Sequence, residues 1–317
     1  MNYTRSSIAT SLPPIDDCLG VKHLSSQVAP ALGYHHKNDR LQRGYGRVET
    51  QLAPAGSAFR SVTSEEIAHY RKHGWVKLER FVPISRVNEI LALGKEKMGE
   101  HGDRNPPPQA FSYFNPLTMR GLGHPVLGPV IKHFGHNARA LMARKAPVGI
   151  RYFTDYFGVK LPSKSPSAHG GTGSTDWHQD YAASASDRSG GMVFWMALID
   201  LTPDFGTMAF LNGSHRFGAM GHYTTYGRGS LLDAYPELLD ECTATGNLSY
   251  SAGDVTVHSN LCVHSAGLNV TDKPRWTYMV IVNPADACWN GGPADAFDVT
   301  GLRLYKEMDD GRFPVIS

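Results

Sequence analysis

From residue 150 onward, the sequence alternates short apolar runs with turn-forming residues, and this pattern restricts the fold more than any other feature. Runs of this spacing are typical of an antiparallel sandwich or barrel, and they do not show the strand–helix alternation of a Rossmann fold. The 33 Gly and 20 Pro residues of the 317-residue chain fit such a turn-rich framework. The pattern predicts strands at residues 151–159, 177–182, 192–199, 208–211, 254–257, 262–264 and 276–282.

The part of the chain before residue 150 has a helical texture instead. Thr63 and Glu66 have the spacing of a capping box, and Gly74 stands where a helix would end. Further elements are expected as a strand at residues 75–78, a helix that begins at residue 85 and a helix over residues 127–146. We therefore expect a helical layer in front of the β framework.

The division of the chain into parts follows these textures. Residues 1–60 mix Pro, Gly and polar residues with little periodicity, so we interpret them as an N-terminal extension. Residues 61–317 are predicted to form a single domain. It consists of the helical layer (about 61–148), a mainly β core (about 149–285) and a C-terminal tail.

Charge and cysteine usage argue against several classes of protein. The 31 basic and 29 acidic residues nearly balance, so no electrostatic footprint for nucleic acid or an anionic membrane is visible. The four cysteines form no CxxC pair, which argues against a disulfide framework and against a Cys-rich zinc site. The sequence has neither an apolar stretch of membrane-span length nor an N-terminal signal-peptide pattern, so we expect a cytoplasmic protein.

One pair of residues has the spacing of metal ligands within a predicted strand. His178 and Asp180 are two residues apart, and alternate residues of a strand point to the same side, so both can share one metal ion. The same spacing occurs at His101 and Asp103, in a Gly- and Pro-rich stretch where nothing orients the two side chains. Because a His-x-Asp spacing is expected about once by chance in such a chain, the motif needs support from other segments.

A third ligand has to come from a distant segment, and two histidines compete for that place. His258 and His264 have an even separation, which places both on one face of an unbroken strand, but the polar Ser259 and Asn260 between them indicate a bend. Arg275 follows His264 by eleven residues across a turn-rich connection, and its planar guanidinium suits a bidentate carboxylate. These residues alone do not decide between the two histidines.

Taken together, these segments resemble the phytanoyl-CoA dioxygenase branch (PhyH-like) of the Fe(II)/2-oxoglutarate-dependent oxygenases. The resemblance rests on the strings WHQDY, FWMALIDLTPDFGTMAFLNGSH, GDVTVHSNLCVHSAGLN and DKPRW, preceded by VTSEEIAHYRKHGWVKLERFVP, and it covers about residues 60–285. It implies a double-stranded β-helix, which is a cupin-like jelly roll of two sheets, here with flanking helices. It also implies Fe(II) as the metal, 2-oxoglutarate as co-substrate and O2 as oxidant.

The resemblance assigns roles to individual residues by position. His178, Asp180 and His264 match the family's iron ligands, and His258 matches a histidine that is not a ligand. Arg275 matches the residue that binds the distal carboxylate of 2-oxoglutarate. The remaining assignments are Lys160 and Ser265 as further co-substrate contacts, and Trp195, Tyr156 and Phe153 as walls of the substrate pocket.

The chain departs from the family pattern at two positions. The family's usual His-x-Ser-Gly has Ala266 in its third place here, with Ser265 one residue earlier, which calls one expected hydrogen bond to the co-substrate into question. Asp155 stands where many members carry a glutamine, so a different inner wall of the pocket is expected. Asp180 is present where halogenating relatives carry a small residue, which argues against halogenation.

These features support an Fe(II)/2-oxoglutarate-dependent dioxygenase that oxidises an unactivated C–H bond of a small-molecule metabolite and releases succinate and CO2. Hydroxylation is the first expected outcome, with desaturation, epoxidation or rearrangement as alternatives, and a natural-product intermediate is the expected kind of substrate. Residues 162–174 and 218–235 are expected to act as lids. Two other classes stay open: a zinc-dependent hydrolase with ligands His258, Cys262 and His264, and a non-catalytic binding protein on the same fold.

Overall fold

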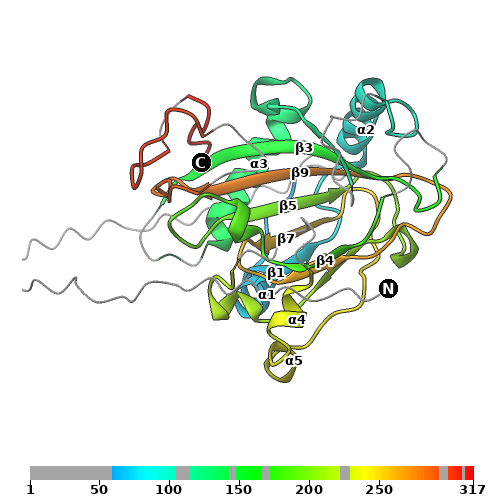
Figure 1. Ribbon diagram of the computed structural model, residues 1–317. Helices are drawn as coiled ribbons and strands as arrows, with labels where there is room; N and C mark the ends of the chain where they lie inside the picture. The colour runs from blue at the N-terminus through cyan, green and yellow to red at the C-terminus, as the bar shows by residue number, and fades with distance from the viewer. Residues whose placement is uncertain are drawn as a thin grey trace, which may run out of the picture. The chain divides into compact units, whose positions relative to one another are not determined.

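Two antiparallel sheets form the framework of the protein (Figure 1). In the computed structural model, the larger sheet has the strand order β1-β7-β5-β9-β3-β2, and the smaller has the order β4-β8-β6. From β3 to β9, successive strands along the chain alternate between the larger and the smaller sheet, which is the winding of a double-stranded β-helix. The predicted fold class is confirmed. The structure describes residues 59–104, 114–142, 144, 148–165, 172–221, 229–292, 299–308 and 311–317.

The elements have the following bounds. The strands are β1 Trp75–Leu78, β2 Asn115–Thr118, β3 Ile150–Lys160, β4 Thr175–His178, β5 Met192–Ala197, β6 Met208–Phe210, β7 Val255–Ser259, β8 His264–Ala266 and β9 Arg275–Pro284. The α-helices are α1 Ser64–His73, α2 Ile84–Met98, α3 Leu127–Leu141, α4 Leu231–Ala234 and α5 Leu238–Glu241. Among the described residues, none of these helices is long and apolar enough to cross a membrane.

Helix α1 begins and ends as the sequence predicts. The Thr63 hydroxyl accepts a hydrogen bond from the Glu66 backbone N–H (3.2 Å), and the Glu66 carboxylate accepts one from the Thr63 N–H (2.8 Å). Gly74 then takes the left-handed conformation (φ 83°) and donates its N–H to the Tyr70 carbonyl oxygen (2.7 Å). A residue with a Cβ adopts this conformation poorly, so glycine ends the helix and turns the chain directly into β1.

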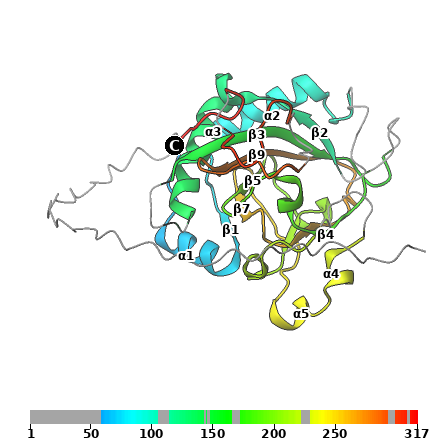
Figure 2. The same ribbon diagram turned by 60° about the vertical axis from the view of Figure 1, so that its left-hand side comes forward.

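Each face of the larger sheet packs against a different layer. One face of β9 packs into the main apolar core together with α2 and α3. The β9 residues on this face are Trp276, Tyr278, Val280 and Val282. Figure 2 shows α3 on the other side of this sheet from β4. Side chains alternate along a strand, so a second set of β9 residues faces the smaller sheet: Arg275, Thr277, Met279, Ile281 and Asn283. The inner face between the sheets is therefore the place where polar side chains gather.

The differences from the predicted elements have local causes. β4 ends at His178, and Asp180–Ala183 form a 3-10 turn, because the Tyr181 N–H leaves the sheet and donates to the Asn260 carbonyl oxygen (2.8 Å). β8 begins at His264 rather than at residue 262, and α3 ends at Leu141 because Met142 is extended. The sequence does not predict β2, α4 and α5, because none of these segments is an alternating apolar run bounded by turn residues or a run of helical periodicity. The assignment of residues 1–60 to an extension stays a prediction, as residues 1–58 lie outside the described residues.

Asp155 does not form part of the inner wall, contrary to the interpretation from sequence. It lies on the outer face of β3, where its buried carboxylate accepts hydrogen bonds from the Gly121 N–H (2.8 Å), the Tyr278 hydroxyl (2.5 Å) and the Tyr152 hydroxyl. Burial, with the neighbouring Asp155 carboxylate, raises the pKa of Tyr278 well above its ordinary value, so this phenol stays a donor. Asp155 thus joins two strands to the segment before α3.

We expect Asp155→Ala to lower the free energy of unfolding by on the order of 3 kcal/mol, because it leaves two phenol hydroxyls and one backbone N–H buried without an acceptor. Urea unfolding followed by circular dichroism measures the change. Asp272→Ala, at an exposed carboxylate in the turn before β9, is the control and should stay within about 0.5 kcal/mol of wild type. Equal stability of the two variants would contradict this role of Asp155.

Candidate metal centre

Three side chains from two distant segments converge between the sheets. His178 at the end of β4 pairs directly with His264 at the start of β8, and their imidazole rings lie 4.2 Å apart between centroids. Asp180 follows on the 3-10 turn. One ligand atom from each of these residues lies within 4.8 Å of the other two, and this is the one such His/Cys/Asp/Glu group within the described part of the chain. The convergence predicted from sequence for His178, Asp180 and His264 is present.

The Asp180 carboxylate lies between the two histidines. Its Oδ1 is 3.5 Å from His178 Nε2, and its Oδ2 is 3.7 Å from His264 Nε2. The Asp180 side chain keeps 31% of its surface exposed, whereas both histidines are buried. The sequence argument correctly brings His178 and Asp180 together, but it places both on one strand. Asp180 instead lies on the turn that follows β4.

Both histidines are oriented by the same backbone device. His178 Nδ1 lies 2.7 Å from the Asp176 carbonyl oxygen, and His264 Nδ1 lies 2.9 Å from the Cys262 carbonyl oxygen. A carbonyl only accepts hydrogen bonds, so each Nδ1 carries the proton and each Nε2 presents a lone pair. In both cases the acceptor is two residues earlier in the chain. The two Nε2 atoms are thus directed at Asp180, with their lone pairs available to a metal.

His258 occupies a different position from the other two histidines. It belongs to β7 of the larger sheet, is 1% exposed, and places its Nε2 3.0 Å from Asp180 Oδ2. The group with metal-ligand spacing contains His264 and not His258. This arrangement fits the assignment of His264 over His258, and it gives His258 a different contact, with the carboxylate. The sequence reasoning missed this contact, although the alternation of Val255 and Val257 with polar neighbours places His258 on the inner face.

The electrostatics of the group favour a charged carboxylate on Asp180 and a neutral imidazole on His264. Burial opposes charge on Asp180, but the proximity of His264 and of the His178 and His258 imidazoles holds its pKa well below its ordinary value. Burial, followed by the proximity of His178, holds the pKa of His264 well below its ordinary value. Two imidazole nitrogens and one carboxylate oxygen are the donor set of the facial triad that binds non-haem iron and leaves three positions open.

A second polar cluster lies on the same inner face, where β9 pairs with β3. Lys160 and Arg275 are direct cross-strand partners, and they are 0% and 3% exposed. The Lys160 ammonium donates to the Gly267 carbonyl oxygen (2.6 Å), and the Arg275 guanidinium donates to the Gly206 carbonyl oxygen. Within the described residues, Arg275 Nε has no hydrogen-bond partner and neither cation has a salt bridge to a carboxylate.

Burial makes this pair of cations costly. Burial, followed by the proximity of Arg275, lowers the pKa of Lys160 from 10.5 to about 6. Burial lowers the pKa of Arg275 to about 10, so its guanidinium stays charged at neutral pH. Lys160 is completely buried on a strand that has neighbours on both sides, so it is not an exposed lysine at the edge of the sheet. Two buried basic groups without an acid partner are suited to bind an anion.

The residues predicted to line the substrate pocket do not lie in one cluster. Trp195 lies under the Arg275 guanidinium at 5.3 Å and packs in one apolar cluster with Tyr156. Phe153 packs against Phe313 in a separate cluster, so it does not share a wall with them. Ser265 is the middle residue of β8, and strand alternation directs it to the face opposite His264. Its assignment as a co-substrate contact is not supported by this placement.

The ligand set of the alternative zinc site is not assembled. The Cys262 thiol lies near the Ser214 hydroxyl (3.8 Å) and the Leu211 carbonyl oxygen (3.9 Å), and it is absent from the group with metal-ligand spacing. Burial, opposed by the hydrogen bond with Ser214, raises the pKa of Cys262 to about 12. A thiol in this state is a poor metal ligand, because the thiolate is the form that binds zinc.

Comparisons with known proteins agree with the donor set. Residues 70–277 match the family model described as phytanoyl-CoA dioxygenase (PhyH). A comparison with curated proteins gave no match. Among solved structures, the non-heme alpha ketoglutarate dependent carbocyclase SnoK from nogalamycin biosynthesis is 22% identical, with a TM-score of 0.65 over 81% of this chain and 97% of its own.

Two further solved structures contain ligands. The epimerase SnoN, in complex with Fe3+, alpha ketoglutarate and nogalamycin RO, is 22% identical, with a TM-score of 0.62 over 80% of this chain and 98% of its own. EvdO2 from Micromonospora carbonacea var. aurantiaca, complexed with 2-oxoglutarate, is 18% identical, with a TM-score of 0.54 over 76% of this chain and 99% of its own. At these identities, the likeness to the three structures shows a shared fold.

Proposed function

The chain belongs to the phytanoyl-CoA dioxygenase family, and from that premise we propose that it oxidises an unactivated C–H bond of a small-molecule metabolite. As a member of this family it is an Fe(II)/2-oxoglutarate-dependent oxygenase. The observation that carries the proposal is the convergence of His178, Asp180 and His264 between the two sheets, on the inner face that also bears Arg275.

The proposed metal ligands are His178 Nε2, His264 Nε2 and the Asp180 carboxylate. The donor chemistry fits Fe(II): two imidazole nitrogens and one carboxylate would hold the ion and would leave positions open for 2-oxoglutarate and O2. When bound, iron with 2-oxoglutarate and O2 supplies an oxidant able to remove hydrogen from an unactivated carbon, with succinate and CO2 as co-products. The role of the chain is to place the substrate carbon and to exclude water.

We assign the distal carboxylate of 2-oxoglutarate to Arg275 and Lys160. The guanidinium offers a planar pair of donors, and the unpartnered Arg275 Nε is the kind of buried polar atom that a bound carboxylate satisfies. Trp195 supports the guanidinium from below through a cation–π contact at 5.3 Å. A bound dianion offsets the energetic cost of the buried Arg275 charge and favours protonation of Lys160, so affinity and orientation of the co-substrate come from the same contact.

We assign His258 to orienting Asp180. The His258 Nε2–H donates to Asp180 Oδ2, which leaves Oδ1 as the oxygen for the metal. Such a contact fixes a carboxylate in one binding mode, and partners of this kind tune metal affinity. His258 comes from the larger sheet and the proposed ligands come from the smaller sheet and its adjoining turn, so this contact also holds the two sheets in register at the metal.

The reaction outcome is proposed from chemistry and relatives together. Hydroxylation is the first candidate. The carbocyclase SnoK and the epimerase SnoN have the same fold, so ring closure and epimerisation are also within the reach of such a site. Both come from nogalamycin biosynthesis, which supports a natural-product substrate. The near balance of 31 basic and 29 acidic residues does not favour a CoA thioester. The lid role of residues 162–174 and 218–235 stays a prediction, because residues 166–171 and 222–228 lie outside the described residues.

The proposal predicts a weak visible charge-transfer band at about 500 nm when Fe(II) and 2-oxoglutarate are added to the protein without O2. Asp180→Ala should lose the band, because a carboxylate ligand is removed. Cys262→Ala is the matched control and should keep it, since this thiol points away from the group. Lack of a band in wild type, or an undiminished band in Asp180→Ala, would count against the proposed function.

A second prediction follows from the pKa of Lys160. With a pKa of about 6 the free amine is neutral at pH 8, and a bound dianion raises that pKa, so 2-oxoglutarate binding should take up close to one proton at pH 8. Below pH 6 the amine is already protonated and the uptake should vanish. Anaerobic calorimetry in buffers of different ionisation enthalpy measures it. Lys160→Met should bind more weakly with no uptake, and an unchanged uptake in this variant would refute the assignment.

A further inference from the structure

Two buried asparagines have side chains whose polar atoms are all unsatisfied. Asn260 and Asn283 are 3% and 1% exposed, and within the described residues neither the Nδ2 nor the Oδ1 atom of either residue has a hydrogen-bond partner. Asn269, which is 0% exposed, shows the usual arrangement: its amide donates to two carbonyl oxygens and accepts from Thr271 N and Oγ1. Buried amides without partners cost free energy, so their presence needs a reason.

The two unsatisfied amides meet at one point. A methyl group in place of a Gly191 hydrogen would come within 2.5 Å of Asn260 Nδ2 and within 2.5 Å of Asn283 Oδ1. Asn260 is also joined to Gly191 through its backbone, since the Asn260 N–H donates to the Gly191 carbonyl oxygen (3.0 Å). The two carboxamides, which approach from the ends of β7 and β9, therefore occupy the space over Gly191 where a Cβ would lie.

The position of this point relative to the metal centre follows from the sheet register. On β9, the inner-face residues run from Arg275 at one end to Asn283 at the other. Ile281 is the inner-face residue next to Asn283. Ile281 pairs with Val193, and Val193 pairs with His258, which contacts Asp180. The metal ligands therefore lie along the inner face between the Arg275 end and the asparagine end.

The 3-10 turn that carries Asp180 gives a second link to the asparagine end. The N–H of Tyr181, the residue after Asp180, donates to the Asn260 carbonyl oxygen (2.8 Å). The asparagine end of the inner face thus adjoins the turn that carries Asp180, on the side away from Arg275. Because 2-oxoglutarate is assigned to the Arg275 side, the amide pair faces the side left for the substrate.

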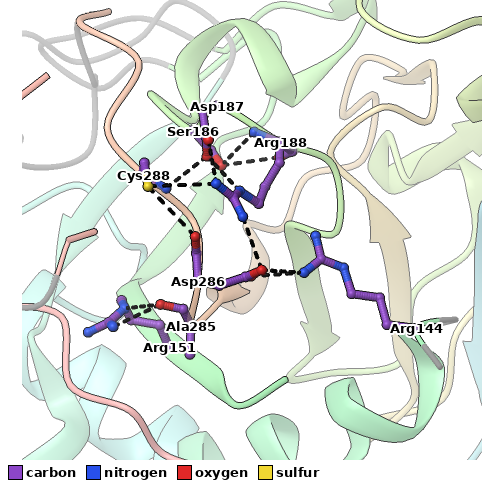
Figure 3. A network of polar contacts seen from close by, with 8 residues as sticks. All are labelled: Arg144, Arg151, Ser186, Asp187, Arg188, Ala285, Asp286 and Cys288. Carbon is purple, nitrogen blue, oxygen red and sulfur yellow. Dashed lines mark hydrogen bonds and ion pairs between the residues drawn. The ribbon is translucent and has the colours of Figure 1, made fainter. Parts of the chain in front are cut away.

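The surroundings of the pair hold it rigidly without adding a charge to it. Figure 3 shows Asp286, three residues after Asn283, between Arg144 (2.7 Å) and Arg188 (3.0 Å). Arg188 lies three residues before Gly191, so this ion pair joins the segment before Gly191 to the segment after Asn283. Arg151, the strand partner of Asn283, directs its guanidinium to the carbonyl oxygens of Ala285 and Phe313.

We propose that Asn260 and Asn283 form a substrate subsite that binds a neutral polar group, such as a hydroxyl, carbonyl or carboxamide. Two carboxamides offer both donors and acceptors and no net charge, so they complement a group that both gives and accepts hydrogen bonds, and they disfavour a bare anion. The inference rests on the proposed function for its role in catalysis. The proposed substrate is therefore a molecule with a neutral polar group close to the carbon that reacts.

Thermal unfolding of Asn→Leu variants tests whether these amides are retained for function. Leucine has a similar size and no polar atoms, so Asn260→Leu and Asn283→Leu should melt at or above the wild-type temperature. Asn269→Leu is the matched control and should melt lower by roughly 4 °C or more, because it loses a satisfied amide. Melting of the first two variants as low as Asn269→Leu would overturn the proposal, since the amides would then be structural groups bonded through water.

Crystals soaked with acetamide test the ligand itself. This neutral probe should bind against Asn260 and Asn283 in the wild-type protein and not in Asn283→Leu, and its absence from wild type would overturn the subsite. The Fe(II)/2-oxoglutarate charge-transfer band, measured in the same variants, separates this inference from the proposed function. A band retained in Asn283→Leu shows an intact metal site, whereas a wild-type protein without a band contradicts the proposed function and leaves the melting and acetamide results to decide the subsite.

Discussion

The pairing of β4 with β8 is the contact on which the rest of the site depends. It sets His178 opposite His264, although 86 positions of sequence separate the two residues, and both rings are then turned by hydrogen bonds to carbonyls of their own segments. The end of β4 at His178 matters equally, because the following 3-10 turn brings the Asp180 carboxylate between the two imidazoles. A one-residue slip in this register would send one imidazole to the opposite face.

The inner face of the larger sheet arranges the remaining groups in order along β9. Two buried basic groups lie at the Arg275 end, the contact between His258 and Asp180 lies farther along, and two unsatisfied amides lie at the Asn283 end. The outer face of the same sheet is an apolar core with α2 and α3, interrupted by the satisfied carboxylate of Asp155. One face of the sheet therefore packs into the apolar core that stabilises the fold, and the other face bears the unsatisfied polar groups. Such groups persist in folded proteins where a ligand forms the missing hydrogen bonds.

Much of the architecture could be predicted from sequence because it rests on local patterns. Thr63, Glu66 and Gly74 define α1, and the apolar runs after residue 150 define most strands within two residues. The ends of β4 and β8 could not be predicted, because the Asn260 carbonyl that captures the Tyr181 N–H is distant in sequence. For the same reason, neither the face on which Asp155 lies nor the direction of Cys262 could be derived: strand parity is lost wherever a bulge or turn intervenes, as it does between Tyr152 and Thr154.

The central claim is that this chain couples the oxidation of 2-oxoglutarate by O2 to chemistry at a His178–Asp180–His264 iron site. The most direct measurement is the isotopic composition of succinate formed under 18O2 with Fe(II) and 2-oxoglutarate. The account predicts that succinate carries one 18O atom, because oxidative decarboxylation places one atom of O2 in the new carboxylate, and that Asp180→Ala forms none. Succinate free of 18O, or labelled succinate formed equally by Asp180→Ala, would contradict it.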